Sequence, residues 1–227
     1  MNTLTCGAHN LHDEHGLPTF FADVVFYSEA IPRGIRARRR ALLKRAVARH
    51  AKSRARGYAV KSTWRNKTLA IAVNTALLTP VSKEYHRAHG GIKKVTPSRG
   101  TFIVKCRTVD GDRKVALVGE HRINAAFPPF RRGEDIIRPK FWGEHTALTL
   151  RLVDELEAEG YFVIAGGDLN TPHGESGYEG RLREQGSGLD RLGCTKSGRW
   201  SKFTRLARVG SDHHRIKATL TLPKEFS

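Results

Sequence analysis

Four short apolar runs, separated by polar or basic segments, lie in the first third of the chain. Residues 4–11, 23–28, 58–63 and 68–74 are dense in β-branched, aromatic or aliphatic side chains, which predicts four strands. Glu29 directly follows the second run. A carboxylate at the end of a buried strand is placed for a ligand rather than for the core.

The middle of the chain alternates between apolar and polar positions on both sides of a polar tetrapeptide. Residues 101–109 and 114–121 flank Asp-Gly-Asp-Arg, a composition typical of a hairpin turn, and His121 ends the second predicted strand. Residues 79–99 are polar, rich in Gly, Lys and His, and show no periodicity. They are predicted as a surface loop.

A helix is predicted over residues 139–160. Leu152 and Leu156 belong to an apolar set at helical spacing, with Pro139 at the beginning of the segment and Gly160 at its end. The remaining segments are predicted as a strand, a polar connection and two further strands, over 161–165, 171–188, 189–192 and 215–222.

Length and charge narrow the class of protein. No repeat or linker divides residues 1–227, so one domain is expected, and the alternation of β and α segments indicates an α/β protein. The net charge of +18 calls for a polyanionic partner, of which nucleic acid is the commonest. Ribosomal and packaging proteins can be equally basic without catalysis, so charge alone identifies no reaction.

Cysteine usage and hydropathy bear on the compartment. Cys6, Cys106 and Cys194 are odd in number and widely separated, which argues against a disulfide framework or a thiolate zinc site. No run approaches the ~20 apolar residues of a membrane span, and the first residues lack the pattern of a signal peptide. A cytoplasmic monomer without a membrane partner is expected.

The most basic segment, residues 32–57, carries a thin apolar stripe consistent with one amphipathic helix. No acidic residue occurs between Glu29 and Glu84, so neighbours in sequence cannot neutralise its many Arg and Lys side chains. We expect this segment to bind phosphate backbones, an interaction that weakens steeply with salt. The candidate residues are Arg36, Arg39, Arg40 and Lys44.

Acidic, amide and imidazole side chains recur where predicted strands end. In chain order they are Asn10, Glu29, His121, Asp168, Asn170, Asp190, Asp212 and His213. Oxygen ligands such as Glu29 and Asp212 suit Mg²⁺ or Mn²⁺. Taken singly, such a residue is more often a cap or a solvated turn residue. His9, His12 and His15 lack a fourth ligand at a recognisable spacing, so zinc is not expected.

Taken in order, these motifs resemble the endonuclease/exonuclease/phosphatase superfamily, which includes DNase I-like and exonuclease III-like enzymes. The motifs are Ala-His-Asn-Leu, Val-Val-Phe-Tyr-Ser-Glu, Gly-Gly-Asp-Leu-Asn, Gly-Leu-Asp-Arg-Leu and Ser-Asp-His, and they span residues 10–213. The resemblance implies a DNase I-like, four-layer α/β fold, in which a two-layer β-sandwich is flanked by helices.

The resemblance also implies roles at a metal ion. Glu29 would be the principal carboxylate ligand of Mg²⁺ or Mn²⁺, Asn10 would lie beside the ion, and Asp212 would contribute directly or through water. Asp168 and Asn170 would orient the attacking water and the phosphate.

Two histidines complete the implied site. His213 would act at the phosphorus while hydrogen-bonded to Asp190, and a carboxylate behind an imidazole fixes its tautomer. His121 would bind phosphate or act as an acid, and Asn124 would follow as a substrate-binding residue.

The sequence departs from the family pattern at two places. No Glu occurs near Ser98 and Arg99, where DNase I-like enzymes supply a carboxylate partner for this histidine. Phosphate binding is therefore the preferred role of His121, and Arg99 is a further candidate for substrate binding. The second departure is His12, which stands where several relatives have an acidic ligand.

The leading hypothesis is a metal-dependent nuclease, an endonuclease in first preference, that hydrolyses DNA by in-line attack of an activated water. RNA stays open as the substrate, because backbone cleavage does not separate the two polymers. The alternatives are a small phosphodiesterase or phosphatase of the same superfamily and a noncatalytic nucleic-acid-binding protein on this scaffold.

Overall fold

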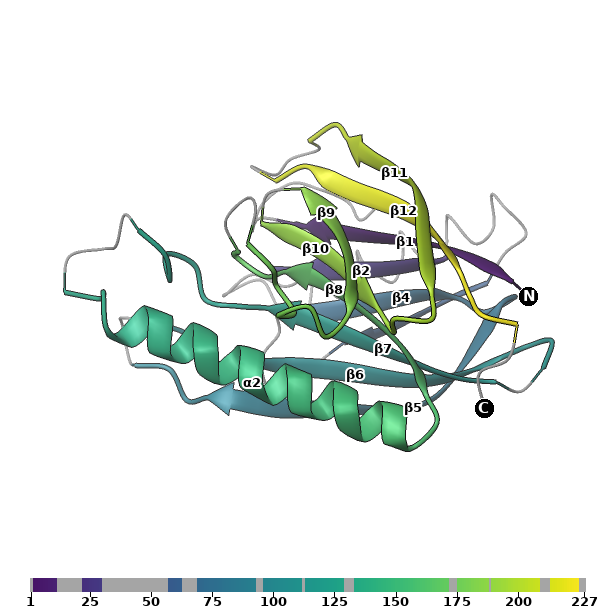
Figure 1. Ribbon diagram of the computed structural model, residues 1–227, viewed down its shortest axis with the longest axis horizontal. Helices are drawn as coiled ribbons and strands as arrows, with labels where there is room; N and C mark the ends of the chain where they lie inside the picture. The colour runs from purple at the N-terminus through teal and green to yellow at the C-terminus, as the bar shows by residue number, and fades with distance from the viewer. Residues whose placement is uncertain are drawn as a thin grey trace.

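The computed structural model describes residues 2–11, 22–29, 57–62, 69–92, 96–111, 113–128, 133–171, 175–187, 189–208 and 213–224. These residues form two six-stranded sheets and one helix (Figure 1). In spatial order the first sheet consists of β11 (Arg199–Leu206), β12 (Arg215–Thr221), β1 (Thr3–Asn10), β2 (Val24–Ser28), β4 (Leu69–Asn74) and β3 (Tyr58–Ser62). The second consists of β5 (Leu78–His89), β6 (Arg99–Thr108), β7 (Lys114–His121), β8 (Phe162–Asp168), β10 (Asp190–Cys194) and β9 (Arg183–Ser187).

The two sheets repeat one pattern of strand directions. Each has a central parallel pair, β1 with β2 in the first sheet and β7 with β8 in the second. All other neighbours in both sheets pair antiparallel. Parallel neighbours end at the same edge of a sheet, so each sheet presents two adjacent carboxyl ends at one edge.

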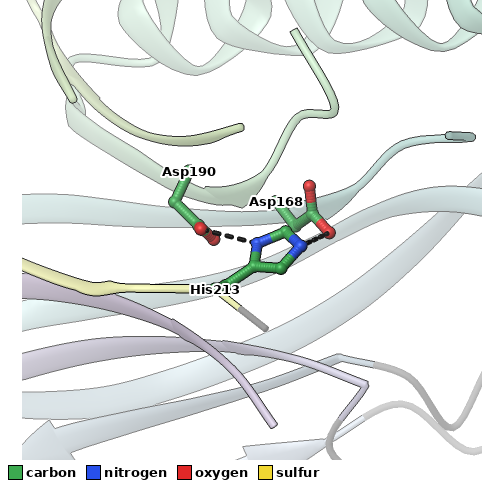
Figure 2. A group of neighbouring side chains, drawn as sticks. All are labelled: Asp168, Asp190 and His213. Atoms are coloured by element: carbon green, nitrogen blue, oxygen red, sulfur yellow. Dashed lines mark hydrogen bonds and ion pairs between the residues drawn. The ribbon is translucent and has the colours of Figure 1, made fainter. Parts of the chain in front are cut away.

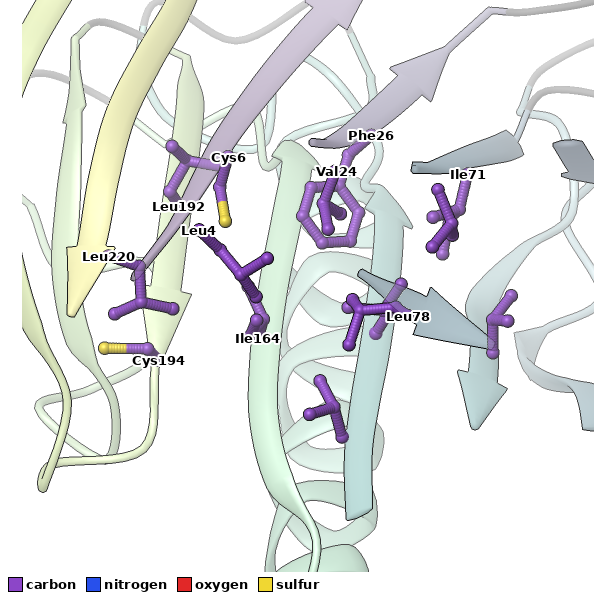
Figure 3. Packing of buried hydrophobic residues seen from close by; sticks show 14 of the residues in the cluster. Leu4, Cys6, Val24, Phe26, Ile71, Leu78, Ile164, Leu192, Cys194 and Leu220 are labelled. Atoms are coloured by element: carbon purple, nitrogen blue, oxygen red, sulfur yellow. The ribbon is translucent and has the colours of Figure 1, made fainter. Parts of the chain in front are cut away.

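The main core lies between the sheets, where side chains of both inner faces interdigitate (Figure 3). Strands β7 and β8 are buried on both faces. Leu117 and Ile164 belong to the core between the sheets, whereas Val118 and Val163 belong to a second core on the outer face. This two-sided burial explains why β8 reads as a continuous apolar run, and it differs from the one apolar face that alternation predicted for β7.

The helix α2 (Ile137–Ala158) covers the outer face of the second sheet with Leu152, Val153 and Leu156 (Figure 1). The prediction of a helix over 139–160 is therefore correct to within two residues at each end. Gly160 follows the helix with a positive φ of 81°, the left-handed conformation in which glycine often ends a helix.

The prediction of a surface loop over 79–99 is wrong. Most of that segment is β5, which pairs with β6 along its length and forms one edge of the second sheet. An edge strand pairs on one side only, and most side chains of β5 are at least partly exposed, so the strand has no apolar pattern. Charged and polar residues are typical of such edges.

The other two differences have the same cause. Strand β9 lies inside the predicted connection 171–188, and the patterns of the sequence give no signal for β11. Both strands form sheet edges.

Strand β8 is longer than predicted and continues past Ala165 as far as Asp168. The two residues between them are glycines, so this part of the strand has no apolar side chains that could have marked it in the sequence.

Two further expectations concern the rest of the chain. The basic helical segment 32–57, with Arg36, Arg39, Arg40 and Lys44, lies outside the described residues apart from Gly57. Within the described part of the chain, no helix combines the length and the hydropathy that crossing a membrane requires.

Candidate active site

The carboxyl ends of the central strands of both sheets meet at one place. Asn10 of β1 is paired with Ser28 of β2, and His121 of β7 is paired with Asp168 of β8. A hydrogen bond of 2.8 Å from Asn10 Nδ2 to Asp168 Oδ2 joins the two sheets. The first residue of β10, Asp190, is paired with Asp168 as well. Residues 158 positions apart therefore share one buried cluster.

Asp168 lies at the centre of this cluster, and its side chain is only 3% exposed. Its Oδ1 accepts a hydrogen bond of 3.0 Å from the backbone N–H of Asn170, in addition to the bond from Asn10. Burial, and next the negative charge of Asp190, raise the pKa of Asp168 to about 7, against the opposing effects of His213 and these two hydrogen bonds.

His213 lies between the two aspartates (Figure 2). Its Nδ1 is 2.7 Å from Asp190 Oδ2, and its Nε2 faces Asp168 Oδ2 at 3.9 Å. The Asp190 carboxylate can only accept, so Nδ1 carries the proton in this contact and Nε2 is directed at the centre of the cluster. The arrangement orients the ring for work at its second nitrogen.

Glu29 approaches the cluster from β2. It is the first residue after the strand and has a positive φ of 52°, a conformation that non-glycine residues seldom adopt. Its Oε1 lies 3.6 Å from His121 Nε2, and Asp168 Oδ2 lies 3.7 Å from the same nitrogen. Two carboxylates from different sheets therefore converge on one point.

His121 is buried and has Arg99 as its cationic neighbour. Arg99 Nη2 is 3.4 Å from His121 Nε2. Burial, and then the charges of Arg99, His213 and His145, lower the pKa of His121 well below its usual value. Because a guanidinium group can only donate, Nε2 of the neutral ring is the acceptor in this contact. The polar partner of His121 Nε2 in this contact is therefore the cationic Arg99.

The chemistry of the cluster fits a hard divalent cation. Ligand atoms of Asp168, Asp190 and His213 all lie within 4.8 Å of one another, and Glu29 adds a carboxylate oxygen on the same His121 Nε2 that Asp168 approaches. Asp168 and Asp190 are like charges in a buried place, a repulsion that a cation would offset. Oxygen-rich donor sets of this kind suit Mg²⁺ or Mn²⁺. Asp212, the third expected ligand, lies outside the described residues.

Two expected residues lie around the cluster rather than at its centre. Asn170 has a positive φ of 51°, and its Nδ2 donates to the backbone carbonyl of Arg122 at 3.0 Å. Asn124 is exposed, and both its Oδ1 and its carbonyl oxygen accept hydrogen bonds of 2.8 Å from Arg138 Nη1.

Sequence reasoning missed one residue at the centre of the site. The Ser28 hydroxyl accepts from the backbone N–H of Asp168 at 3.1 Å and donates to the carbonyl of Glu120 at 3.2 Å. It therefore joins β2 to both central strands of the other sheet. No pattern along the chain signals this role, because the partners are 92 and 140 residues away.

Comparisons with known proteins identify the fold. No family model matches the sequence, and no curated protein matches it. A solved structure of an endonuclease/exonuclease/phosphatase family protein from Bacteroides thetaiotaomicron superposes with a TM-score of 0.70 at 15% identity, covering 98% of this chain and 99% of the other. The mannosyl-6-phosphatase Bt3783 of the same organism gives 0.67 at 14% identity, with 96% and 100% covered.

A third similar structure is the human Nocturnin catalytic domain with a bound sulfate anion. It superposes with a TM-score of 0.67 at 12% identity, covering 96% of this chain and 94% of the other. At such identities the likeness establishes the fold. The expected DNase I-like sandwich of the endonuclease/exonuclease/phosphatase proteins is thereby confirmed.

Proposed function

We propose that this protein is a divalent-metal-dependent hydrolase of phosphate esters, and that its substrate is nucleic acid, DNA in first preference. The observation that carries the proposal is the convergence of Glu29, Asp168 and the Asp190–His213 pair at the joined ends of two sheets. Carboxylates beside an oriented imidazole are the groups that phosphoester hydrolysis requires.

Glu29 and Asn10, together with Asp212, would hold Mg²⁺ or Mn²⁺. When bound, the ion would neutralise charge on the phosphoryl oxygens and make a water molecule more acidic. Asp168 and Asn170 are fixed to each other by the 3.0 Å hydrogen bond between them and would orient the attacking water.

His213 would supply the mobile proton. Asp190 holds its Nδ1, so Nε2 is the atom that would exchange a proton or a hydrogen bond with the reacting phosphate. Arg99 would provide the cationic group for that phosphate, since its guanidinium reaches His121 at the same point of the cluster. His121 would orient Arg99 and accept from it.

The choice of nucleic acid is supported by a basic edge of the first sheet, one end of which lies toward the site. Between Asp190 and Asp212 the sequence has no acidic residue. Strands β11 and β12 with their flanks carry exposed or half-exposed cations, namely Lys196, Arg199, Lys202, Arg205, Arg208 and Lys217. Among the described residues none of these six has an ion-pair partner, and β12 begins two residues after His213. We name this set the β11–β12 cations.

A small phosphomonoester is the second candidate substrate, favoured by the likeness to a mannosyl-6-phosphatase. Plasmid DNA, single-stranded DNA, RNA and mannose 6-phosphate should be assayed side by side, with Mg²⁺ and with a chelator. We expect cleavage of DNA that needs the metal. Equal turnover with chelator would refute the proposal, and turnover of the sugar phosphate alone would reassign the substrate.

The same assay tests the imidazole. His213→Ala should lower kcat by roughly 10²–10⁴-fold, because it removes the proton-transferring group, while DNA binding persists. His214→Ala is the matched control, since His214 is the next residue and its Nδ1 contacts the backbone carbonyl of Leu206 instead. If the protein only bound nucleic acid without catalysis, the wild type and both variants would show no metal-dependent cleavage.

A further inference from the structure

A buried ion pair lies directly behind the candidate site. Side chains alternate at the end of β7, so His121 faces the cluster while Glu120 and Arg122 point to the opposite face, under α2. Arg122 Nε donates to Glu120 Oε2 at 2.9 Å, and both side chains are 0% exposed. Neither group takes part in the chemistry proposed above.

The pair is held by residues of α2 and by the chain beyond β8. Thr149 Oγ1 donates to Glu120 Oε2 at 2.9 Å, and Arg122 Nη1 donates to Thr146 Oγ1 at 2.7 Å and to the carbonyl of Gly177 at 2.8 Å. The guanidinium carbon also lies 4.9 Å from the centroid of the Trp142 ring. The ion pair therefore has one fixed geometry relative to the helix.

Burying two charges is expensive. Moving two charges out of water carries a large desolvation penalty, and apolar side chains of similar volume often give an equally stable core. Stability alone therefore does not explain an ion pair at this place. An ion pair would be explained if the site required the backbone of Glu120 and Arg122 to hold one exact position.

The backbone of the same two residues holds the site together. Arg122 N–H donates to the carbonyl of Asp168 at 2.9 Å, and the Arg122 carbonyl accepts from Asn170 Nδ2 at 3.0 Å. The Glu120 carbonyl accepts from Ser28, which in turn accepts from the N–H of Asp168. A shift at Glu120 or Arg122 would consequently move Asp168, Asn170 and the end of β2.

We propose that Glu120 and Arg122 are positioning residues, whose ion pair to each other and hydrogen bonds to α2 hold His121, Asp168 and Asn170 in the geometry that the reaction needs. The inference rests on the proposed function, because it assigns these residues a part in the same site. The proposed ligands are coupled to these residues, because Asn10 donates to Asp168 and because Ser28, next to Glu29, donates to the Glu120 carbonyl. Side chains that support metal ligands from behind typically contribute 10–100-fold to metal affinity or activity.

The chain offers a matched control at the opposite end of β2. There the Asp23 carboxylate accepts from Thr5 Oγ1 at 2.6 Å and from Asn74 Nδ2 at 3.0 Å, away from the candidate site. Glu120→Gln and Asp23→Asn make the same carboxylate-to-amide change in two hydrogen-bonded networks. Both should lower the midpoint of thermal unfolding, but only Glu120→Gln should also lower kcat, by about 10–100-fold with KM nearly unchanged.

Two further variants separate positioning from stability. The double variant Glu120→Gln with Arg122→Met removes both charges, so we expect it to regain the stability that the single change removes but not its kcat. Thr149→Val keeps the shape and both charges and removes one hydrogen bond to Glu120, and it should lower kcat by a smaller factor. This milder variant carries the test if Glu120→Gln does not fold.

Titration with Mn²⁺ supplies a measurement that needs no substrate. Glu120→Gln should bind Mn²⁺ about tenfold more weakly than the wild type, and Asp23→Asn should bind it equally well. If the wild type cleaves no phosphoester, the proposed function fails, while this difference in affinity still supports the positioning role. Equal kcat and equal Mn²⁺ affinity in Glu120→Gln and Asp23→Asn would overturn the inference, as would the absence of Mn²⁺ binding by the wild type.

Discussion

At the scale of single residues, the environment of Asp168 shows how burial changes chemistry. The same carboxyl group on the surface would be ionised at neutral pH, but here burial and Asp190 favour the protonated form. The charged form is favoured by Asn10, Asn170 and His213, but their combined effect on the pKa is smaller than that of burial and Asp190. A divalent cation at the cluster would shift that balance, so metal binding and proton release should be coupled.

This coupling gives a prediction for stability. A folded-state pKa of about 7, raised from 3.8, means that the folded protein binds the proton more tightly than the unfolded chain. The contribution of Asp168 to stability is therefore present below pH 3.8 and disappears as the pH rises toward 7. In chelator, Asp168→Asn should unfold at a higher temperature than the wild type at pH 8, with a smaller difference at pH 5.

Thermal unfolding at the two pH values, with and without Mg²⁺, measures the effect. Mg²⁺ should raise the unfolding temperature of the wild type more than that of Asp168→Asn, because only the wild type gains a compensated charge. If the unfolding temperatures of the wild type and of Asp168→Asn in chelator depended on pH in the same way, Asp168 would be ionised even without metal.

At the scale of elements, the backbone of β8 leaves no room for a side chain at Gly167, which pairs with Glu120 of β7 beside the site. Gly167 has a positive φ of 142°, and a Cβ atom built on it would lie 2.0 Å from the carbonyl oxygen of Glu120. Only glycine fits at position 167, which lies against the backbone of the positioning residue Glu120 and directly precedes Asp168. Strand ends held this tightly allow two sheets to present side chains at fixed distances.

Gly167→Ala should accordingly cost about 3 kcal/mol or more of unfolding free energy, since the new methyl group meets backbone that cannot move away. Gly180 is the matched control, because it also has a positive φ, of 71°, but a Cβ there would contact nothing within 4 Å. Gly180→Ala should cost only about 1 kcal/mol. Denaturant unfolding of both variants checks the difference, and equal decreases in stability would contradict this lack of room at Gly167.

At the scale of the whole molecule, the net charge of +18 is distributed unevenly. The β11–β12 cations lie at one edge of the first sheet, whereas α2 covers the outer face of the second sheet (Figure 1). Cations of α2 such as Lys140 and Arg151 have acidic neighbours one helical turn away. A polyanion would therefore favour the edge formed by β11 over the helix.

Changing Arg199, Lys202 and Arg205 together to Gln should weaken binding of duplex DNA and flatten its salt dependence. The slope of log K against log salt concentration should fall by about 0.9 for each phosphate that the variant no longer neutralises. The matched control changes Lys140 and Arg151, whose side chains are 68% and 67% exposed, to Gln. Fluorescence anisotropy at several salt concentrations measures both, and equal slopes for the two variants would exclude the β11–β12 cations as a binding surface.

The sequence by itself determined the buried strands, the helix and the identity of the polar residues at the strand ends. Strands such as β2 and β7 are buried, so their apolar patterns reflect the core directly. The order of motifs from Asn10 to His213 was sufficient to predict the fold. It also predicted that Asn10, Glu29, His121, Asp168, Asp190 and His213 would lie together, whereas Asp212 lies outside the described residues and the roles of all these groups belong to the proposal.

Only the tertiary structure decided the rest. Strands β5, β9 and β11 are sheet edges, and their formation depends on pairing with a neighbour rather than on burial of their own side chains. The bridge made by Ser28, the ion pair behind His121 and the raised pKa of Asp168 depend on how the two sheets and the helix pack. Hydrophobic periodicity reports which side chains are buried, but it does not report which distant polar groups are buried together.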